Sequence, residues 1–303
     1  MRARILAGGV AATLLIAAGP AAADHGDANP PWPSLLPARD VPAGHGPHPV
    51  ENCEEISIAC ADDLARRLDE QWTALDARCD HRAVASLSYL RITQALRDDL
   101  GRPHPRFFPH PDWMLALLTT FSNRYFAAFA DYEAGRPVPE AWRIAYDATT
   151  KGDISAGQDV LLFSNAHVQH DLPFAIEEMG LRSPEGESYK PDHDGINEIN
   201  TRILDPTQDE VAERYDPTFS LVDLKPSPLD ELGATEVVKV WREGAWRNAE
   251  RLVTAGSAAE RKQVIAGIDL TSRLWAEAIA AGEMPGFRAM RDDYCRAQQA
   301  ARG

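Results

Sequence analysis

Apolar residues recur at helical intervals along most of this chain, and no other feature of the sequence constrains the fold as strongly. Leu64, Leu68, Trp72 and Leu75 stand three or four residues apart, as do the apolar residues of the later segments. The alternation of apolar and polar residues that is typical of strands is almost absent, and no repeat of fixed period is visible. We therefore predict an all-α fold, an irregular multi-helix bundle that forms a single domain.

Glycine and proline clusters interrupt this periodicity and divide the chain into helices. Helices are predicted over residues 61–79, 81–100, 111–134, 139–149, 153–179, 192–204, 230–255, 257–282 and 285–299. Residues 205–229 contain four prolines and are predicted to form an ordered surface loop with room for one short helix.

The first 23 residues have the three-part pattern of a secretory signal peptide. Arg2 and Arg4 precede an apolar run of 14 residues, and three alanines end at Ala23. The run is shorter than the roughly 20 residues that a membrane-spanning helix needs. We expect cleavage to leave Asp24 first, with residues 24–60 as a Pro/Gly-rich N-terminal arm and 61–303 as the helical domain. The predicted protein is secreted and has no stable membrane insertion.

The formal net charge of −15 makes a nucleic acid an unfavourable partner. A small-molecule ligand or substrate is still compatible with this charge, because a local pocket can differ in charge from the whole chain. The four cysteines, an even number in an exported chain, predict two disulfides. Three connectivities are possible, and we favour Cys53–Cys60 with Cys79–Cys295. The second bond would tie the last helix to the end of the first.

The most informative polar residues lie in the apolar stretch Asn165–Pro173. On one helix His167, His170 and Asp171 are three and four residues apart and point toward one region. Because the stretch is apolar around most of its circumference, these side chains must be paired, hydrogen-bonded or metal-bound. The alternative is structural: Pro173 would end the helix near His170, Asp171 would cap a second helix, and His167 would be an ordinary core histidine.

A second polar group follows in residues 190–198. His193 shares a helical face with Asn197, whereas Asp192 and Asp194 are explained by helix capping. Three histidines with carboxylates inside 28 residues suit a zinc-like divalent cation. The predicted metal ligands are His167, Asp171 and His193, and the predicted catalytic base or supporting residue is His170 or Asp194.

Two other features of the sequence predict specific contacts. Arg91 and Arg124 fall among apolar and aromatic residues, where an arginine usually pairs with a buried carboxylate, and Asp171 is the obvious candidate. Asp80 is expected to cap the helix that follows it, which places His81 in the first turn of that helix.

The segments just described resemble a family of secreted or exported bacterial proteins known only as a domain of unknown function. The resemblance rests on Asn-Ala-His-x-x-x-Asp-Leu-Pro at Asn165–Pro173 and Lys-Pro-Asp-His-Asp at Lys190–Asp194, and it extends from about Asp62 to the C-terminus. It implies no activity.

The chain is also weakly similar to the helical zinc phosphoesterases, phospholipase C and P1-type nuclease, which use His-x-x-x-Asp on one helix. Those enzymes also use an N-terminal tryptophan, where this chain would have Asp24. They add a His-x-x-x-Glu motif, whereas His193 and Glu198 are one residue too far apart. The similarity therefore implies at most a reduced mononuclear zinc site.

Two functions follow from these patterns. The first is a metal-dependent, zinc-like hydrolase of an ester or phosphoester, in which bound zinc activates water. The alternative is a non-catalytic pocket protein that binds an apolar or amphipathic small ligand, with the His/Asp cluster as a structural hydrogen-bond network. An interaction module is a third possibility, favoured by the proline-rich arm alone.

Overall fold

The computed structural model describes residues 36–219 and 233–302, and it confirms the predicted all-α bundle. No strand or sheet occurs in these two ranges, and no helix within them is both long and apolar enough to cross a bilayer. The predicted signal peptide and the new N-terminus at Asp24 lie outside the described residues. The helices are α1 (Ile58–Asp76), α2 (Ala83–Leu100), α3 (Pro111–Glu133), α4 (Glu140–Lys151), α5 (Ala156–Ser164), the π-helical segment η1 (Asn165–Asp171), α6 (Leu172–Met179), α7 (Lys190–Tyr215), α8 (Gly233–Val253), α9 (Ala258–Ala280) and α10 (Phe287–Arg302).

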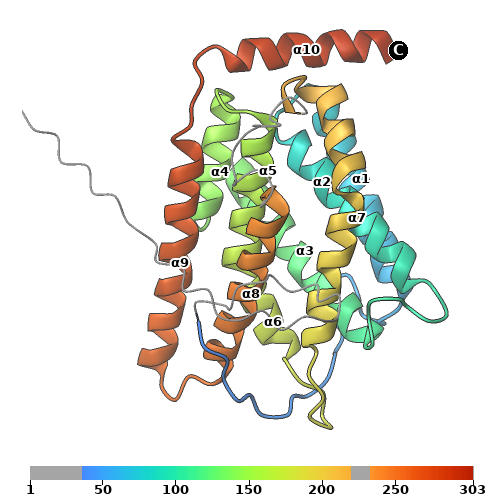
Figure 1. The fold of residues 1–303 in the computed structure, drawn as a ribbon, viewed down its shortest axis with the longest axis vertical. Coiled ribbons are helices and arrows are strands. Elements are labelled where there is room, and N and C mark those ends of the chain that lie inside the picture. The colour runs from blue at the N-terminus through green and yellow to red at the C-terminus, as the bar shows by residue number, and fades with distance from the viewer. Residues whose placement is uncertain (1–35, 220–232, 303) are drawn as a thin grey trace, which may run out of the picture.

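The helix formed by α5, η1 and α6 lies in the middle of the bundle. Its η1 segment contacts α3, α4, α8 and α9, which explains why this stretch is apolar on most sides. α10 lies across one end of the bundle (Figure 1). Large side chains fill the interior, among them Trp113, Tyr125, Trp142, Tyr146 and Phe163.

Both predicted disulfides are present. Cys53 and Cys60 close a short loop at the start of α1, and Cys79 joins Cys295 over a sequence separation of 216 residues. The second bond fastens α10 to the segment that connects α1 and α2. The described part of the chain therefore has no free cysteine.

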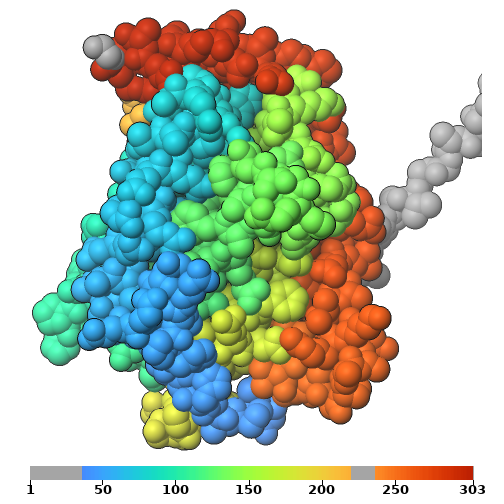
Figure 2. Space-filling view, turned by 180° about the vertical axis from the view of Figure 1, so that it is seen from behind, coloured from blue at the N-terminus to red at the C-terminus, as the bar shows by residue number. Residues whose placement is uncertain are grey.

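The segment that precedes α1 is extended and lies on the surface of the bundle (Figure 2). The backbone N–H of Arg39 donates to a carboxylate oxygen of Glu250 at 3.0 Å, and the N–H of Gly44 donates to the carbonyl of Ser183 at 3.3 Å. A Cβ at Gly44 would lie 2.3 Å from the carbonyl oxygen of Arg182, so only glycine fits this close approach. The part of the predicted arm that is described is thus packed against the bundle.

Contrary to expectation, His81 precedes α2, which begins at Ala83, and does not lie in its first turn. The predicted loop from residue 205 is also wrong, because α7 continues to Tyr215. Pro206 lies inside this helix, and a proline there removes one backbone hydrogen bond. The last turns are held by packing, because Val211 and Tyr215 are buried and Trp72 donates to the Tyr215 hydroxyl at 2.8 Å. Tertiary contacts therefore extend a helix that the local sequence disfavours; residues 220–229 of the predicted loop lie outside the described residues.

Candidate functional site

The predicted site residues His167, His170 and Asp171 lie together in η1, where the helix widens. The N–H of Leu172 donates to the carbonyl of His167, five residues back, as in a π-helix. This wider turn lets the helix continue past Pro173, which cannot donate and would crowd the carbonyl four residues before it. The alternative in which the helix stops near His170 and Asp171 caps another helix is therefore wrong.

Asp171 is a buried carboxylate that accepts three hydrogen bonds. Its Oδ2 lies 3.0 Å from Nε1 of Trp142 and 3.1 Å from Nδ1 of His167, and its Oδ1 lies 2.7 Å from Nδ1 of His170. Burial alone would raise the pKa of Asp171, but the hydrogen bonds from the two histidines lower it below its usual value. Asp171 is therefore ionised at neutral pH, and its charge is compensated by three N–H donors.

His167 is held in one orientation and is neutral. Its ring stacks on Phe121, with the centroids 3.4 Å apart and the planes 5° apart, and the residue is 4% exposed. Burial lowers the pKa of His167 below its ordinary value despite the neighbouring Asp171. Since Asp171 fixes the proton on Nδ1, Nε2 is the nitrogen that can accept a hydrogen bond.

His170 lies between two carboxylates. Its Nδ1 is 2.7 Å from Asp171, and its Nε2 is 3.2 Å from Oδ1 of Asp269 on α9. Burial alone would lower the pKa of His170, but the two carboxylates raise it above its ordinary value. Both ring nitrogens are thus engaged in ion pairs. A catalytic base needs a free nitrogen, so this geometry suits a structural role for His170.

A cavity of about 90 Å³ adjoins this network, and the His167 side chain lines it. Most of the wall is aliphatic or aromatic. Two buried polar atoms, the hydroxyl of Tyr89 and Oδ1 of Asn200, have no hydrogen-bond partner in the described structure. The wall consists of Leu68, Tyr89, Ile92, Thr93, Leu96, Met114, Leu117, Leu118, Phe121, Ser122, Tyr125, Ser164, His167, Val168, Leu172, Ile196, Asn200, Val238 and Arg242.

The other two predicted site residues, His193 and Asp194, belong to a different cluster on α7. Nδ1 of His193 lies 3.0 Å from Asp194, and Nζ of Lys190 lies 2.7 Å from both oxygens of that carboxylate. Burial, reinforced by Arg242, lowers the pKa of His193 to about 3. Burial would raise the pKa of Asp194, but His193 and Lys190 lower it to about 2. Asp194 is therefore an ion-pair partner of Lys190.

The described residues contain no group of three or more histidine, cysteine, aspartate or glutamate side chains arranged to hold a metal ion. The rings of His167 and His170 both direct Nδ1 at Asp171, and His193 directs Nδ1 at Asp194. The structure thus brings two of the three predicted metal ligands together and places the third in another cluster.

Asp171 is not the partner of either arginine for which the sequence suggested it. Arg91 forms a two-pronged pair with Glu210, at 2.7 and 2.8 Å, and Arg124 pairs with Glu178 at 3.0 Å. Both carboxylates are on helices that the sequence alone could not place next to these arginines. The negative charge of Asp171 is compensated by the histidines instead.

Three residues of the site could not be assigned from the sequence. Trp142 on α4 donates to Asp171, Phe121 on α3 stacks on His167, and Arg242 on α8 lines the cavity. Arg242 is buried and donates to the carbonyl of His193 and to Asn197. The sequence places Arg242 next to Trp241 and at helical spacing from Ala245 and Trp246. This pattern could have identified it as a buried arginine, since a charge among buried residues needs a partner.

Comparison with known proteins identifies a family but assigns no activity. No curated protein and no solved structure is significantly similar to the chain. A family of unknown function, DUF5995, matches residues 61–282. This range contains η1, every residue of the cavity wall and the cluster around His193, and it ends before α10. On this match the chain belongs to the family of unknown function DUF5995.

Proposed function

We propose that this protein binds a small amphipathic molecule in the cavity beside His167, and that the Asp171 network is the support that orients the binding residues. The observation that carries the proposal is an apolar cavity whose wall contains two buried polar atoms without partners, on Tyr89 and Asn200. A buried polar atom without a partner costs free energy that a bound molecule can recover.

The polar groups of the cavity define the polar end of the ligand. Oδ1 of Asn200 and Nε2 of His167 accept hydrogen bonds, and the Tyr89 hydroxyl can donate or accept. Burial raises the pKa of Tyr89 well above its usual value, so its hydroxyl keeps its proton. These groups are complementary to an alcohol, which supplies a donor and an acceptor on one oxygen.

The size of the cavity limits the ligand. Its volume of about 90 Å³ is below the roughly 300 Å³ at which drug-sized sites begin and below the roughly 150 Å³ of a cavity that holds benzene. The ligand is therefore a short aliphatic alcohol or the hydroxyl-bearing end of a longer molecule.

Binding of 1-propanol, 1-butanol and 1-pentanol, with n-pentane as the apolar reference, tests the proposal by ligand-observed NMR. We expect saturable binding of at least one alcohol and weaker binding of n-pentane. Tyr89→Phe removes one cavity hydroxyl and should weaken alcohol binding several-fold. No saturable binding by the native protein, or equal affinities for the alcohols and n-pentane, would overturn the proposal.

A matched variant separates loss of binding from loss of structure. Tyr125 also lines the cavity, but its hydroxyl is already 2.7 Å from Oγ of Ser86. Tyr125→Phe should therefore lower stability with little change in alcohol affinity, the reverse of Tyr89→Phe. If both variants weaken binding equally, the unpartnered hydroxyl is not what selects the ligand.

The second candidate function is a zinc-dependent ester or phosphoester hydrolase, and what favours it is the meeting of His167, His170 and Asp171 in η1. It requires the two rings to turn from the carboxylate toward a cation. Zinc titration of protein purified without a histidine tag tests it: one equivalent of tightly bound zinc that is lost in His167→Ala supports the hydrolase. A protein that binds no zinc excludes it.

A further inference from the structure

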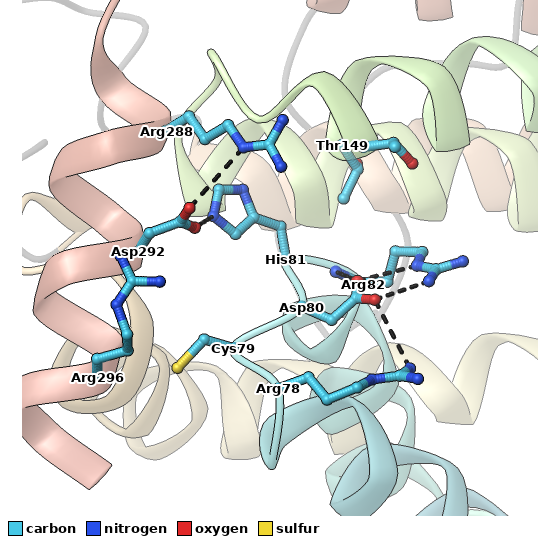
Figure 3. Close-up of a pocket in the computed structure, with 10 residues that line it drawn as sticks. Arg78, Cys79, Asp80, His81, Arg82, Thr149, Arg288, Asp292 and Arg296 are labelled. Carbon is cyan, nitrogen blue, oxygen red and sulfur yellow. Dashed lines mark hydrogen bonds and ion pairs between the residues drawn. The ribbon is translucent and has the colours of Figure 1, made fainter. Parts of the chain in front are cut away.

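A second, larger cavity lies between the segment that follows α1, the end of α4, and α10. Its volume is about 380 Å³, within the range of small-molecule sites. Figure 3 shows side chains from these segments around one space. The residues that line it are Arg78, Cys79, Asp80, His81, Arg82, Thr149, Thr150, Arg288, Asp292 and Arg296.

Positive charge prevails in this wall, although the whole chain has a net charge of −15. Among the described residues, four arginines and two carboxylates, Asp80 and Asp292, line the cavity. Local charge of this kind attracts an anion even to an acidic protein.

The arginines differ in how fully they are paired. Arg82 forms hydrogen-bonded ion pairs with Asp80 and Glu133. By contrast, the contacts from Arg78 to Asp80 and from Arg288 to Asp292 are both 3.8 Å, too long for hydrogen bonds. Arg288 also donates to the carbonyl oxygen of Lys151 at 3.4 Å, and both guanidinium groups keep further N–H donors for a ligand. They come from opposite walls of the cavity.

His81 adds an acceptor to the same wall. Its Nε2 lies 2.9 Å from Asp292, and its Nδ1 is buried without a hydrogen-bond partner among the described residues. The side chain is about nine-tenths buried, and the ring lies between Asp292 and Arg288 (Figure 3). Burial, helped by the charge of Arg291, lowers the pKa of His81 to about 4, so the ring is neutral at pH 7. Its free Nδ1 can accept a hydrogen bond from a ligand hydroxyl.

We propose that this cavity binds a small phosphorylated molecule, with Arg78 and Arg288 as the principal donors to its phosphate group and His81 as an acceptor for a hydroxyl on its organic part. A phosphate group has three acceptor oxygens and nearly two negative charges, so it can engage guanidinium groups from several sides at once. A planar carboxylate matches a single arginine fork. The remaining volume accommodates the organic part of the molecule.

The disulfide joins the two walls of this site. Cys79 lies between Arg78 and Asp80, whereas Cys295 lies next to Arg296. Arg288 and Arg296 lie beyond the segment that matches the family, which ends at residue 282. The phosphate site therefore depends on α10, and it is separate from the cavity beside His167.

Isothermal titration calorimetry at low ionic strength tests this proposal with inorganic phosphate, phenyl phosphate and succinate. The pocket variant is Arg78→Gln with Arg288→Gln, whose side chains are 63% and 58% exposed. The control variant is Arg66→Gln with Arg136→Gln, which removes the same charge from side chains that are 57% and 58% exposed elsewhere on the surface.

We expect one saturable site for phosphate and phenyl phosphate, at least tenfold weaker in the pocket variant and changed less than twofold in the control. Three outcomes would overturn the proposal: no saturable binding of either phosphate, equal weakening by both double variants, or tighter binding of succinate than of phenyl phosphate.

Discussion

The indole N–H of Trp142 donates to Asp171 at 3.0 Å, so a helix outside the central one neutralises part of a buried charge within it. His167 shares the same carboxylate oxygen. The His167 ring is therefore held beside the cavity by the Asp171 carboxylate, which accepts hydrogen bonds from three donors. Removing that charge should loosen the whole site.

Asp171→Asn is expected to lower the free energy of unfolding by about 3 kcal/mol, because an amide cannot accept from three donors and leaves His170 without one of its carboxylates. Urea denaturation measures this. Asp269→Asn is the control: its side chain is more than half exposed, and it contacts the same histidine. Asp269→Asn should lower the free energy of unfolding by less than about 1 kcal/mol. Equal costs would contradict the assigned role of Asp171.

Tyr89→Phe should leave the free energy of unfolding unchanged or raise it slightly, because the deleted hydroxyl is buried without a partner. Tyr125→Phe should lower it by about 1 to 2 kcal/mol, because the hydroxyl of Ser86 loses its hydrogen bond. Thermal and urea denaturation of the two variants check this pair. A larger loss for Tyr89→Phe than for Tyr125→Phe would show that the Tyr89 hydroxyl is already satisfied.

His193 should make the protein less stable as the pH falls. The pKa of His193 is about 3 in the folded protein, below its ordinary value of 6.5, so the unfolded chain takes up the proton first. Its contribution is fully present above pH 6.5 and is lost as the pH falls toward 3. Between pH 7.5 and 5.0 the free energy of unfolding of the native protein should fall by about 2 kcal/mol more than that of His193→Asn, a variant that retains a donor for Asp194. If the free energies of unfolding of the native protein and His193→Asn change equally with pH, this prediction is wrong.

Arg291→Met should destabilise the protein by about 3 to 5 kcal/mol, because it leaves Asp159 as a buried charge without its cation. Both side chains are buried, and their ion pair is 2.9 Å long. Combining it with Asp159→Asn should cost less than the sum of the two single changes, since the second change removes the orphaned charge. Strict additivity in chemical denaturation would mean that the pair does not interact.

Gly152→Ala should cost more stability than Gly135→Ala. Both glycines have positive φ, at +80° and +65°, and so share the backbone penalty of about 1 kcal/mol. A Cβ at Gly152 would also lie 2.9 Å from Cγ of Arg288 and 3.0 Å from Cε1 of His81, whereas no atom of the described structure lies within 4 Å of a Cβ added at Gly135. Thermal denaturation should show the difference, and equal shifts would contradict the close packing around Gly152.

The sequence predicts the features of this fold that depend on local spacing. Apolar residues at intervals of three and four predict the helices, and the even cysteine count predicts the two disulfides. It fails at α7, where the burial of Tyr215 overrides the tendency of Pro206 to end a helix.

At the candidate site, too, the sequence predicts neighbours on one helix but not contacts between helices. His167, His170 and Asp171 lie together because they are neighbours on one helix, and the sequence shows this directly. Phe121 and Trp142 come from other helices, and their contacts depend on tertiary packing that periodicity does not encode.

A crystal soaked in 3-bromo-1-propanol tests directly whether the cavity beside His167 binds an alcohol, because the anomalous signal of bromine locates the molecule. We expect bromine in the cavity beside Phe121, with the alcohol oxygen within hydrogen-bonding distance of Tyr89, Asn200 or His167. A fully occupied molecule elsewhere, with this cavity empty, would contradict it.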